Sequence, residues 1–112
     1  MRKIVTIAFI AGLFLPPSTL AIENIGRENM MLQGGSSGDV PFPHHRHQTA
    51  LGGDCNLCHS LFPQVSGSIE KLEAEGKLKK KQAMVQCRTC HKTRVSKGQK
   101  AGPVKCRGCH KK

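Results

Sequence analysis

Apolar and polar positions form regular patterns in only a few short stretches of the chain, so the sequence predicts small elements. Residues 40–43 alternate valine and phenylalanine with two prolines, which predicts a short extended segment at a sheet edge. Residues 68–75 predict a short helix, with Ser68 as N-cap and Gly76 as terminator. Glycines and a proline in residues 92–105 predict a looped connection.

The longest apolar run, residues 4–15, follows Arg2 and Lys3 directly and is ended by prolines. The run is too short for a stable membrane span, and a small-x-small sequence ends at Ala21. We therefore predict that residues 1–21 are a signal peptide, cleaved after Ala21, and that the exported protein has no stable membrane insertion. An uncleaved anchor is the alternative.

The composition predicts a polypeptide that cannot build an apolar core by itself. The chain has 112 residues, a net charge of +11, four phenylalanines and no tyrosine or tryptophan. Few aliphatic side chains and a large net charge are typical of chains that stay unfolded alone. The glycine- and serine-rich residues 34–38 predict a flexible leader over 22–38, followed by one folded domain over 39–112.

Candidate chemistry lies in a five-residue pattern that occurs three times and contains every cysteine. The pattern is Cys-x-x-Cys-His, and its three copies are Cys55–His59, Cys87–His91 and Cys106–His110. This is the attachment signature of c-type haem, in which two thiols bond the haem edge and the histidine is the proximal iron ligand. We therefore predict three covalently attached haems c, held by Cys55, Cys58, Cys87, Cys90, Cys106 and Cys109, with His59, His91 and His110 as proximal ligands.

Two other uses of the cysteines have to be weighed. Six cysteines in a short exported chain could form disulfides. The pairs Cys87/Cys90 and Cys106/Cys109 also have the spacing of a four-thiolate zinc site in a small binding module. Neither alternative explains why a histidine follows each cysteine pair, so the haem interpretation is preferred.

The remaining three histidines, His44, His45 and His47, lie together behind the predicted extended segment. On a helical turn His44 and His47 share a face, and His45 points elsewhere. Two imidazoles on one face could each serve a different iron as sixth ligand. A solvent-exposed histidine-rich loop is the other interpretation.

The stretch Gly38–Gln48, the three motifs and the closing Lys105–Lys112 resemble the small triheme cytochromes of the cytochrome c7 family, relatives of cytochrome c3. The resemblance implies short helices, a minimal N-terminal β segment and loops wrapped around three haems. It also implies that His44 ligates the haem on Cys55/Cys58 and that His47 ligates the haem on Cys87/Cys90.

The sequence departs from this family at the third haem. Family members typically take its distal histidine from just before the second motif, where this chain has Ala83 and Met84. We predict Met84 as the sixth ligand, because a thioether is an accepted haem ligand that raises the potential. The alternatives are His45, a lysine, one of the leader methionines Met30 and Met31, or an open iron.

The resemblance implies a periplasmic electron carrier, a monomer that shuttles electrons between respiratory partners, including in metal reduction. Its expected partners are acidic redox proteins, such as inner-membrane quinol-linked and outer-membrane cytochromes. The lysines of residues 77–81 could form the docking patch or merely a solvated face. Nucleic acid is not expected, because no aromatic residues interleave with the basic ones. The alternative function is a haem enzyme or sensor that uses an open third iron.

Overall fold

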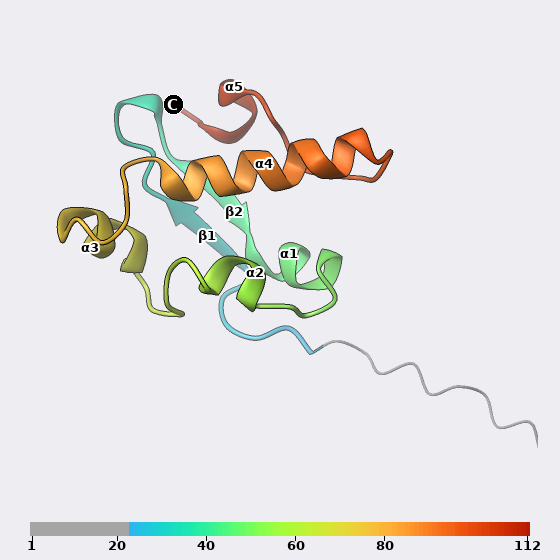
Figure 1. Ribbon diagram of the computed structural model, residues 1–112, viewed down its shortest axis with the longest axis horizontal. Coiled ribbons are helices and arrows are strands. Elements are labelled where there is room, and N and C mark those ends of the chain that lie inside the picture. The colour runs from blue at the N-terminus through green and yellow to red at the C-terminus, as the bar shows by residue number, and fades with distance from the viewer. Residues whose placement is uncertain (1–22) are drawn as a thin grey trace, which may run out of the picture.

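The computed structural model describes residues 23–112, so the predicted signal peptide, residues 1–21, lies outside the described residues. The elements are short and joined by loops (Figure 1). They are β1 (Asn29–Leu32), the 3₁₀ turn η1 (Gly35–Ser37), β2 (Val40–Pro43), α1 (His44–Ala50), α2 (Asn56–His59), α3 (Ser68–Ala74), α4 (Gln82–Ser96) and α5 (Cys106–Cys109). Among the described residues, none of the helices has the length and apolar character that crossing a bilayer requires.

The two strands form an antiparallel hairpin in which Asn29 pairs with Pro43 and Leu32 pairs with Val40. The predicted extended segment is therefore confirmed as β2, and its two prolines are tolerated because the strand has one partner only. The prediction of a flexible leader through residue 38 is wrong for β1 and the turn behind it. The glycine- and serine-rich stretch is the hairpin connection, where Gly38 has a φ of +93°.

Helix α1 begins at His44 directly after β2 and carries three histidines in its first four residues. The predicted helical turn is confirmed, and His44 and His47 are three residues apart on it. Figure 1 shows α1 and α2 next to each other at one end of the hairpin, with α4 running across the opposite side. This arrangement surrounds the hairpin with the segments that carry histidines and cysteines.

Helix α3 confirms the short helix predicted from the sequence, although its first turn is built differently. Gly67, with a φ of +74°, is the N-cap, and the Ser68 hydroxyl donates to the Pro63 carbonyl at 3.0 Å. At the other end, Gly76 has a φ of +69° and its N–H donates to the Glu73 carbonyl at 3.1 Å. The predicted glycine terminator is therefore confirmed.

Helix α4 was not predicted from the sequence; it contains the whole second motif and continues to Ser96. The looped connection expected over 92–105 therefore starts only at Lys97. The C-terminal strand-like end then returns to the hairpin, where the Lys111 N–H donates to the Asp39 carbonyl at 2.8 Å. This contact brings the third motif next to the hairpin connection (Figure 1).

The polypeptide buries almost no apolar side chain of its own. Among the described residues, Leu78 is the one apolar residue classed as buried, at 3% exposure, whereas Val85, Val95 and Met31 are more than half exposed. A domain of this size normally needs an apolar core, a metal or disulfides to stay folded. The predicted lack of a core is confirmed, and large apolar groups must come from elsewhere.

Candidate haem-binding site

Each of the three motifs lies on a helical turn. The first motif forms α2, the second lies in the middle of α4, and the third forms α5 with His110 directly behind it. On such a turn, the first residue of a motif shares a face with the fourth and with the fifth. Two sulfurs and one imidazole of each motif can therefore meet the edge and the centre of the same flat ligand.

All six cysteine thiols are free in the structure, and no three metal-ligating side chains gather at one point in residues 23–112. Burial raises the pKa of the Cys58 and Cys87 thiols above the ordinary value, and neighbouring thiols add to both rises. Each motif thus offers two free thiols for the covalent attachment of a haem.

The histidine rings form two pairs that each join α1 to one motif. The ring centroids of His44 and His59 are 6.3 Å apart, and those of His47 and His91 are 6.2 Å apart. Two imidazoles bound to opposite sides of one iron, with metal–nitrogen bonds of about 2 Å, have ring centroids roughly 6 Å apart. The structure thus brings each upstream histidine to the distance from a proximal histidine that one shared iron requires.

The hydrogen bonds of the histidine rings show which ring nitrogen is left to bind a metal. Five histidines place Nδ1 against a backbone carbonyl, which can only accept, so Nδ1 carries the proton and Nε2 is free. The acceptors are the carbonyls of Arg27 for His44, Pro43 for His47, Phe62 for His59, Pro103 for His91 and Gly38 for His110, at 2.7 to 3.1 Å. Metal-ligating histidines usually have this arrangement, which fixes the tautomer and raises the basicity of the ligating nitrogen.

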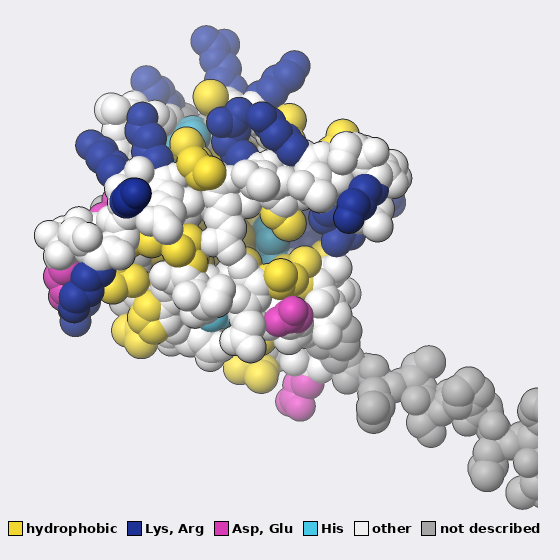
Figure 2. All heavy atoms as spheres, viewed as in Figure 1, with side chains coloured by type: hydrophobic (Ala, Val, Ile, Leu, Met, Phe, Trp, Pro, Cys, Tyr) yellow, Lys and Arg dark blue, Asp and Glu magenta, His cyan; other side chains and the backbone are white. Residues whose placement is uncertain are grey.

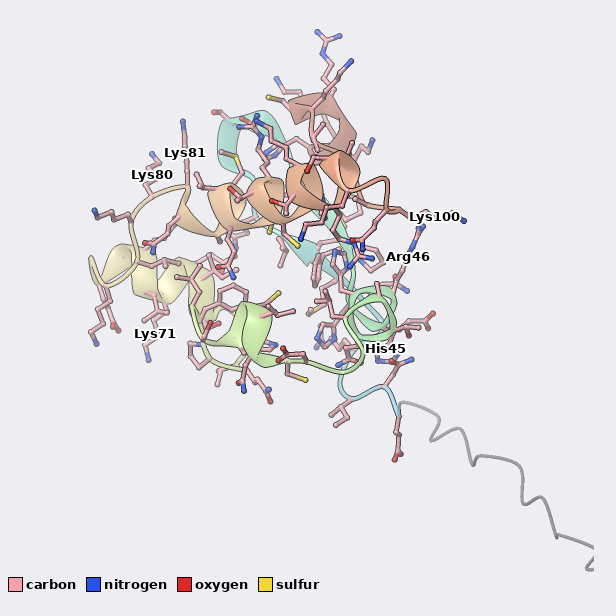
Figure 3. All side chains as sticks on the ribbon, turned by 45° about the vertical axis from the view of Figure 1, so that its right-hand side comes forward. His45, Arg46, Lys71, Lys80, Lys81 and Lys100 are labelled. Carbon is pink, nitrogen blue, oxygen red and sulfur yellow. The ribbon has the colours of Figure 1, made fainter. Side chains whose placement is uncertain are left out.

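His45 is the exception among the six histidines. Its Nε2 donates to the Gly26 carbonyl at 2.8 Å, so the nitrogen that the other five rings leave free is already engaged. Figure 3 shows His45 beside the segment that precedes β1. For His45 to reach the third iron, this hydrogen bond would have to break and the ring would have to leave its side of α1.

His110 has no second imidazole opposite it, although all six histidines lie in the described part of the chain. Its Nδ1 donates to Gly38 at 2.7 Å, and a side chain at Gly34 would collide with that carbonyl and with the ring. The hairpin connection thus fixes the His110 ring and leaves its Nε2 free. An iron bound to His110 would therefore take its sixth ligand from another kind of residue or keep an open position.

Met84 is half-buried on the first turn of α4. It lies seven residues, or about two helical turns, before His91 and therefore on nearly the same face of α4. Ala83 lies about 100° further round the helix. Met84 therefore lies on the side of the second haem, and it can ligate the third iron only if the first turn of α4 adjusts.

Burial lowers the pKa of His47 below its ordinary value, and the nearby His91, His44 and Arg46 act in the same direction. The carbonyl of Pro43 opposes this shift only in part. The ring of Phe42 lies against His47 with a centroid distance of 4.3 Å. Together these neighbours keep His47 unprotonated, which is the form that binds a metal.

Several parts of the site could not be found from motif spacing. The carbonyl groups that orient the rings carry no side-chain signal, and the Arg27 carbonyl comes from the stretch assigned to a loose leader. A side chain at Gly102 would come within 2.5 Å of the His91 ring, so this glycine permits the close approach of the loop. The glycine-proline pair at 102–103 was the one available signal, and it indicated only a loop.

Known proteins of one family are similar to this chain. The profile of the family "Cytochrome c7 and related cytochrome c" matches residues 40–111. Two solved cytochromes c7 from Geobacter sulfurreducens are similar to this chain. PpcC is 32% identical, with a TM-score of 0.49, over 77% of this chain and 99% of its own. PpcB is 31% identical, with a TM-score of 0.47, over 77% of this chain and all of its own. No curated protein sequence gives a significant match.

Proposed function

The chain belongs to the family of cytochrome c7 and related c-type cytochromes, and from this membership we propose that it is an exported, periplasmic electron carrier. The bound haems supply the redox-active iron, and Cys55/Cys58, Cys87/Cys90 and Cys106/Cys109 hold them covalently. We propose that it passes electrons between inner-membrane quinol-linked and outer-membrane cytochromes, including in metal reduction. Family membership supports the electron-carrier part; the respiratory partners follow from the resemblance to that family, and only their acidic character is inferred from charge.

The observation that carries this proposal is the pairing of His44 with His59 and of His47 with His91. An iron held between two imidazoles has no position left for a substrate, so it can only gain or lose an electron. The residues of this chain then set the potential through ligand identity, hydrogen bonds to the rings and exposure. His44 and His47 act in this proposal as distal ligands, and His59, His91 and His110 act as proximal ligands.

The surface supports docking to acidic partners on the side of the third motif. Figure 2 shows lysines and arginines gathered over α4 and α5, whereas acidic side chains are few and lie elsewhere. Exposed basic residues flank α5 directly, and we call them the α5 basic patch: Lys105, Arg107, Lys111 and Lys112. Such a patch speeds encounter with an anionic partner and loses its effect as salt screens it.

Oxidation of the reduced protein by ferricyanide, an anionic acceptor, should therefore slow as ionic strength rises. Between about 0.01 M and 0.1 M salt the screening length falls from about 30 Å to about 10 Å, so a several-fold decrease is expected. The variant Lys105→Glu should be slower at low salt and less sensitive to salt. Stopped-flow kinetics measures both rates.

The matched control is Lys71→Glu, an exposed lysine on α3, which lies at the far corner from α5 (Figures 1 and 3). It reverses a charge without touching the α5 basic patch. Equal rates for the patch variant and the Lys71 variant at low salt would show that the third motif is not the docking side.

The lack of an imidazole opposite His110 would favour a second candidate function, the binding of a small ligand at the third iron, if that position were open. We propose instead that Met84 closes this position after an adjustment of the first turn of α4. Met84→Ala should then remove the thioether–iron charge-transfer band and lower the potential of one haem by on the order of 0.1 V, within the ~0.8 V that axial ligands span. It should also allow a carbon monoxide adduct that the unchanged protein does not form.

The control for this substitution is Met31→Ala, because Met31 is a leader methionine whose side chain is 62% exposed on β1. It should leave the spectrum unchanged. A ready carbon monoxide adduct in the unsubstituted protein would rule out Met84 as ligand and would support the enzyme or sensor function.

A further inference from the structure

The residues before β1 lie against helix α1 and are held there by hydrogen bonds rather than by burial. We call the segment Asn24–Glu28 the N-terminal strap. Its residues are exposed, and the largest apolar one, Ile25, is 69% exposed. In Figure 3 this segment runs alongside α1, close to the labelled His45. Because little apolar surface is buried, the hydrogen bonds determine whether the strap stays in place.

Gln48 of α1 holds the strap with both ends of its side-chain amide. Its Nε2 donates to the Ile25 carbonyl at 2.8 Å, and its Oε1 accepts from the Ile25 N–H at 3.0 Å. The backbone N–H of His45 donates to Glu28 at 3.2 Å, and the His45 ring donates to Gly26 at 2.8 Å. Two residues of one helix thus fix three positions of the strap.

The strap provides the carbonyl that orients His44. Nδ1 of His44 donates to the Arg27 carbonyl at 3.0 Å, and this acceptor is seventeen positions away in the chain. His47, the other histidine of this pair of distal ligands, finds its acceptor four residues back at Pro43. The orientation of His47 is therefore secured by its own helix, whereas that of His44 depends on a separate segment.

Gly26 gives the strap the shape that this contact needs. Its φ is +79°, which lies in the left-handed region. The carbonyls of Gly26 and Arg27 both accept hydrogen bonds from histidines of α1. A residue with a side chain is strained at such a φ. An added Cβ at Gly26 would meet only His44 Cε1 at 3.7 Å, so the backbone conformation and not space makes glycine necessary.

We propose that the N-terminal strap is a positioning element for His44 and that it lowers the reduction potential of the first haem. This inference rests on the proposed role of His44 as a distal ligand. The Arg27 carbonyl accepts the Nδ1 proton, and the imidazole then donates more electron density through Nε2, which favours the oxidised state of a bound metal. The same bond holds the ring at 85° to the plane of His59.

The test removes the Gln48 amide that holds the strap and leaves the proposed iron ligands in place. In the holoprotein, Gln48→Ala should release the strap, so that the His44 Nδ1 proton, whose acceptor is the Arg27 carbonyl, exchanges faster with solvent. The midpoint potential of the first haem should then rise, while those of the other two haems stay unchanged. Haem methyl signals in NMR spectra followed through a redox titration resolve the three haems. Gly26→Ala disturbs the strap from the other side and should shift the same haem in the same direction.

Thr49→Ala is the matched control, because it also changes a neutral α1 side chain that meets the strap, but only through a 3.5 Å contact with Asn24. It should leave the exchange of the His44 Nδ1 proton and all three potentials unchanged. Faster exchange of that proton with no shift of the first haem would overturn the inference. Unchanged exchange in both Gln48→Ala and Gly26→Ala would overturn it as well, because the strap would then be held by something else.

His44→Ala separates a failure of this inference from a failure of the proposed ligand set. If His44→Ala changes the first haem and Gln48→Ala does not, only the role of the strap is wrong. If His44→Ala leaves the first haem unchanged, His44 is not a ligand and the proposed function loses its main support.

Discussion

His47→Ala is expected to open the iron of the second haem, which should then bind carbon monoxide in the reduced protein and change to a high-spin spectrum when oxidised. The rings of His47 and His91 are stacked with a 27° angle between their planes and a centroid distance of 6.2 Å. Burial lowers the pKa of His47, which favours the neutral ring that binds a metal. Loss of one axial imidazole should raise the potential of this haem by on the order of 0.1 V, given the ~0.8 V range that axial ligands cover.

His45→Ala is the matched control for this experiment. It removes an imidazole from the same helix turn, but one whose Nε2 is engaged by the Gly26 carbonyl. The low-spin spectrum of all three haems should persist in this variant. If His45→Ala opened an iron and His47→Ala did not, the assignment of distal ligands from ring orientation would be wrong.

The double substitution Cys87→Ser/Cys90→Ser is expected to unfold the domain rather than to remove one haem cleanly. The second motif lies in the middle of α4, and apart from Leu78 no apolar side chain of the described residues is buried. A small domain is stable by only about 5–15 kcal/mol, so loss of one of three large apolar groups should exceed about 5 kcal/mol. Limited proteolysis and circular dichroism of the exported protein measure the loss.

Leu78→Ala provides the comparison, because it removes the most buried apolar side chain that the polypeptide contributes. A large-to-small substitution of this kind costs about 2–5 kcal/mol, and the variant should still carry three haems. If the cysteine variant retained two haems and melted close to the temperature of the unchanged protein, the haems would not be the core of the fold.

Much of the candidate site could be predicted from local spacing. The spacing within each Cys-x-x-Cys-His motif, and between two histidines three residues apart, is enough to predict which side chains lie together. A helical turn determines which positions share a face. In the structure the His44 ring lies close to His59 and the His47 ring lies close to His91, whereas their role as iron ligands stays a prediction. Strand β2 and helix α3 were likewise predicted from turn residues and alternation.

Other parts depend on contacts between distant residues and could not be predicted. The stretch 34–38 has the composition of a linker, yet it connects two paired strands because residues 29–32 find a partner in β2. His45 looks like a third ligand in the sequence, and only the position of the Gly26 carbonyl shows that its Nε2 is engaged. The looped connection was predicted to begin too early, because α4 continues past the second motif of the chain to Ser96.

The most direct test is the electron paramagnetic resonance spectrum of the fully oxidised, exported protein. Five histidines with a free Nε2 allow two irons with paired imidazoles and one iron with His110 alone. We expect two distinct low-spin bis-imidazole signals, because the ring planes cross at 85° in one pair and at 27° in the other, and a third signal of different ligation. Three bis-imidazole haems would require His45 as a ligand and would contradict this assignment, as would fewer than two.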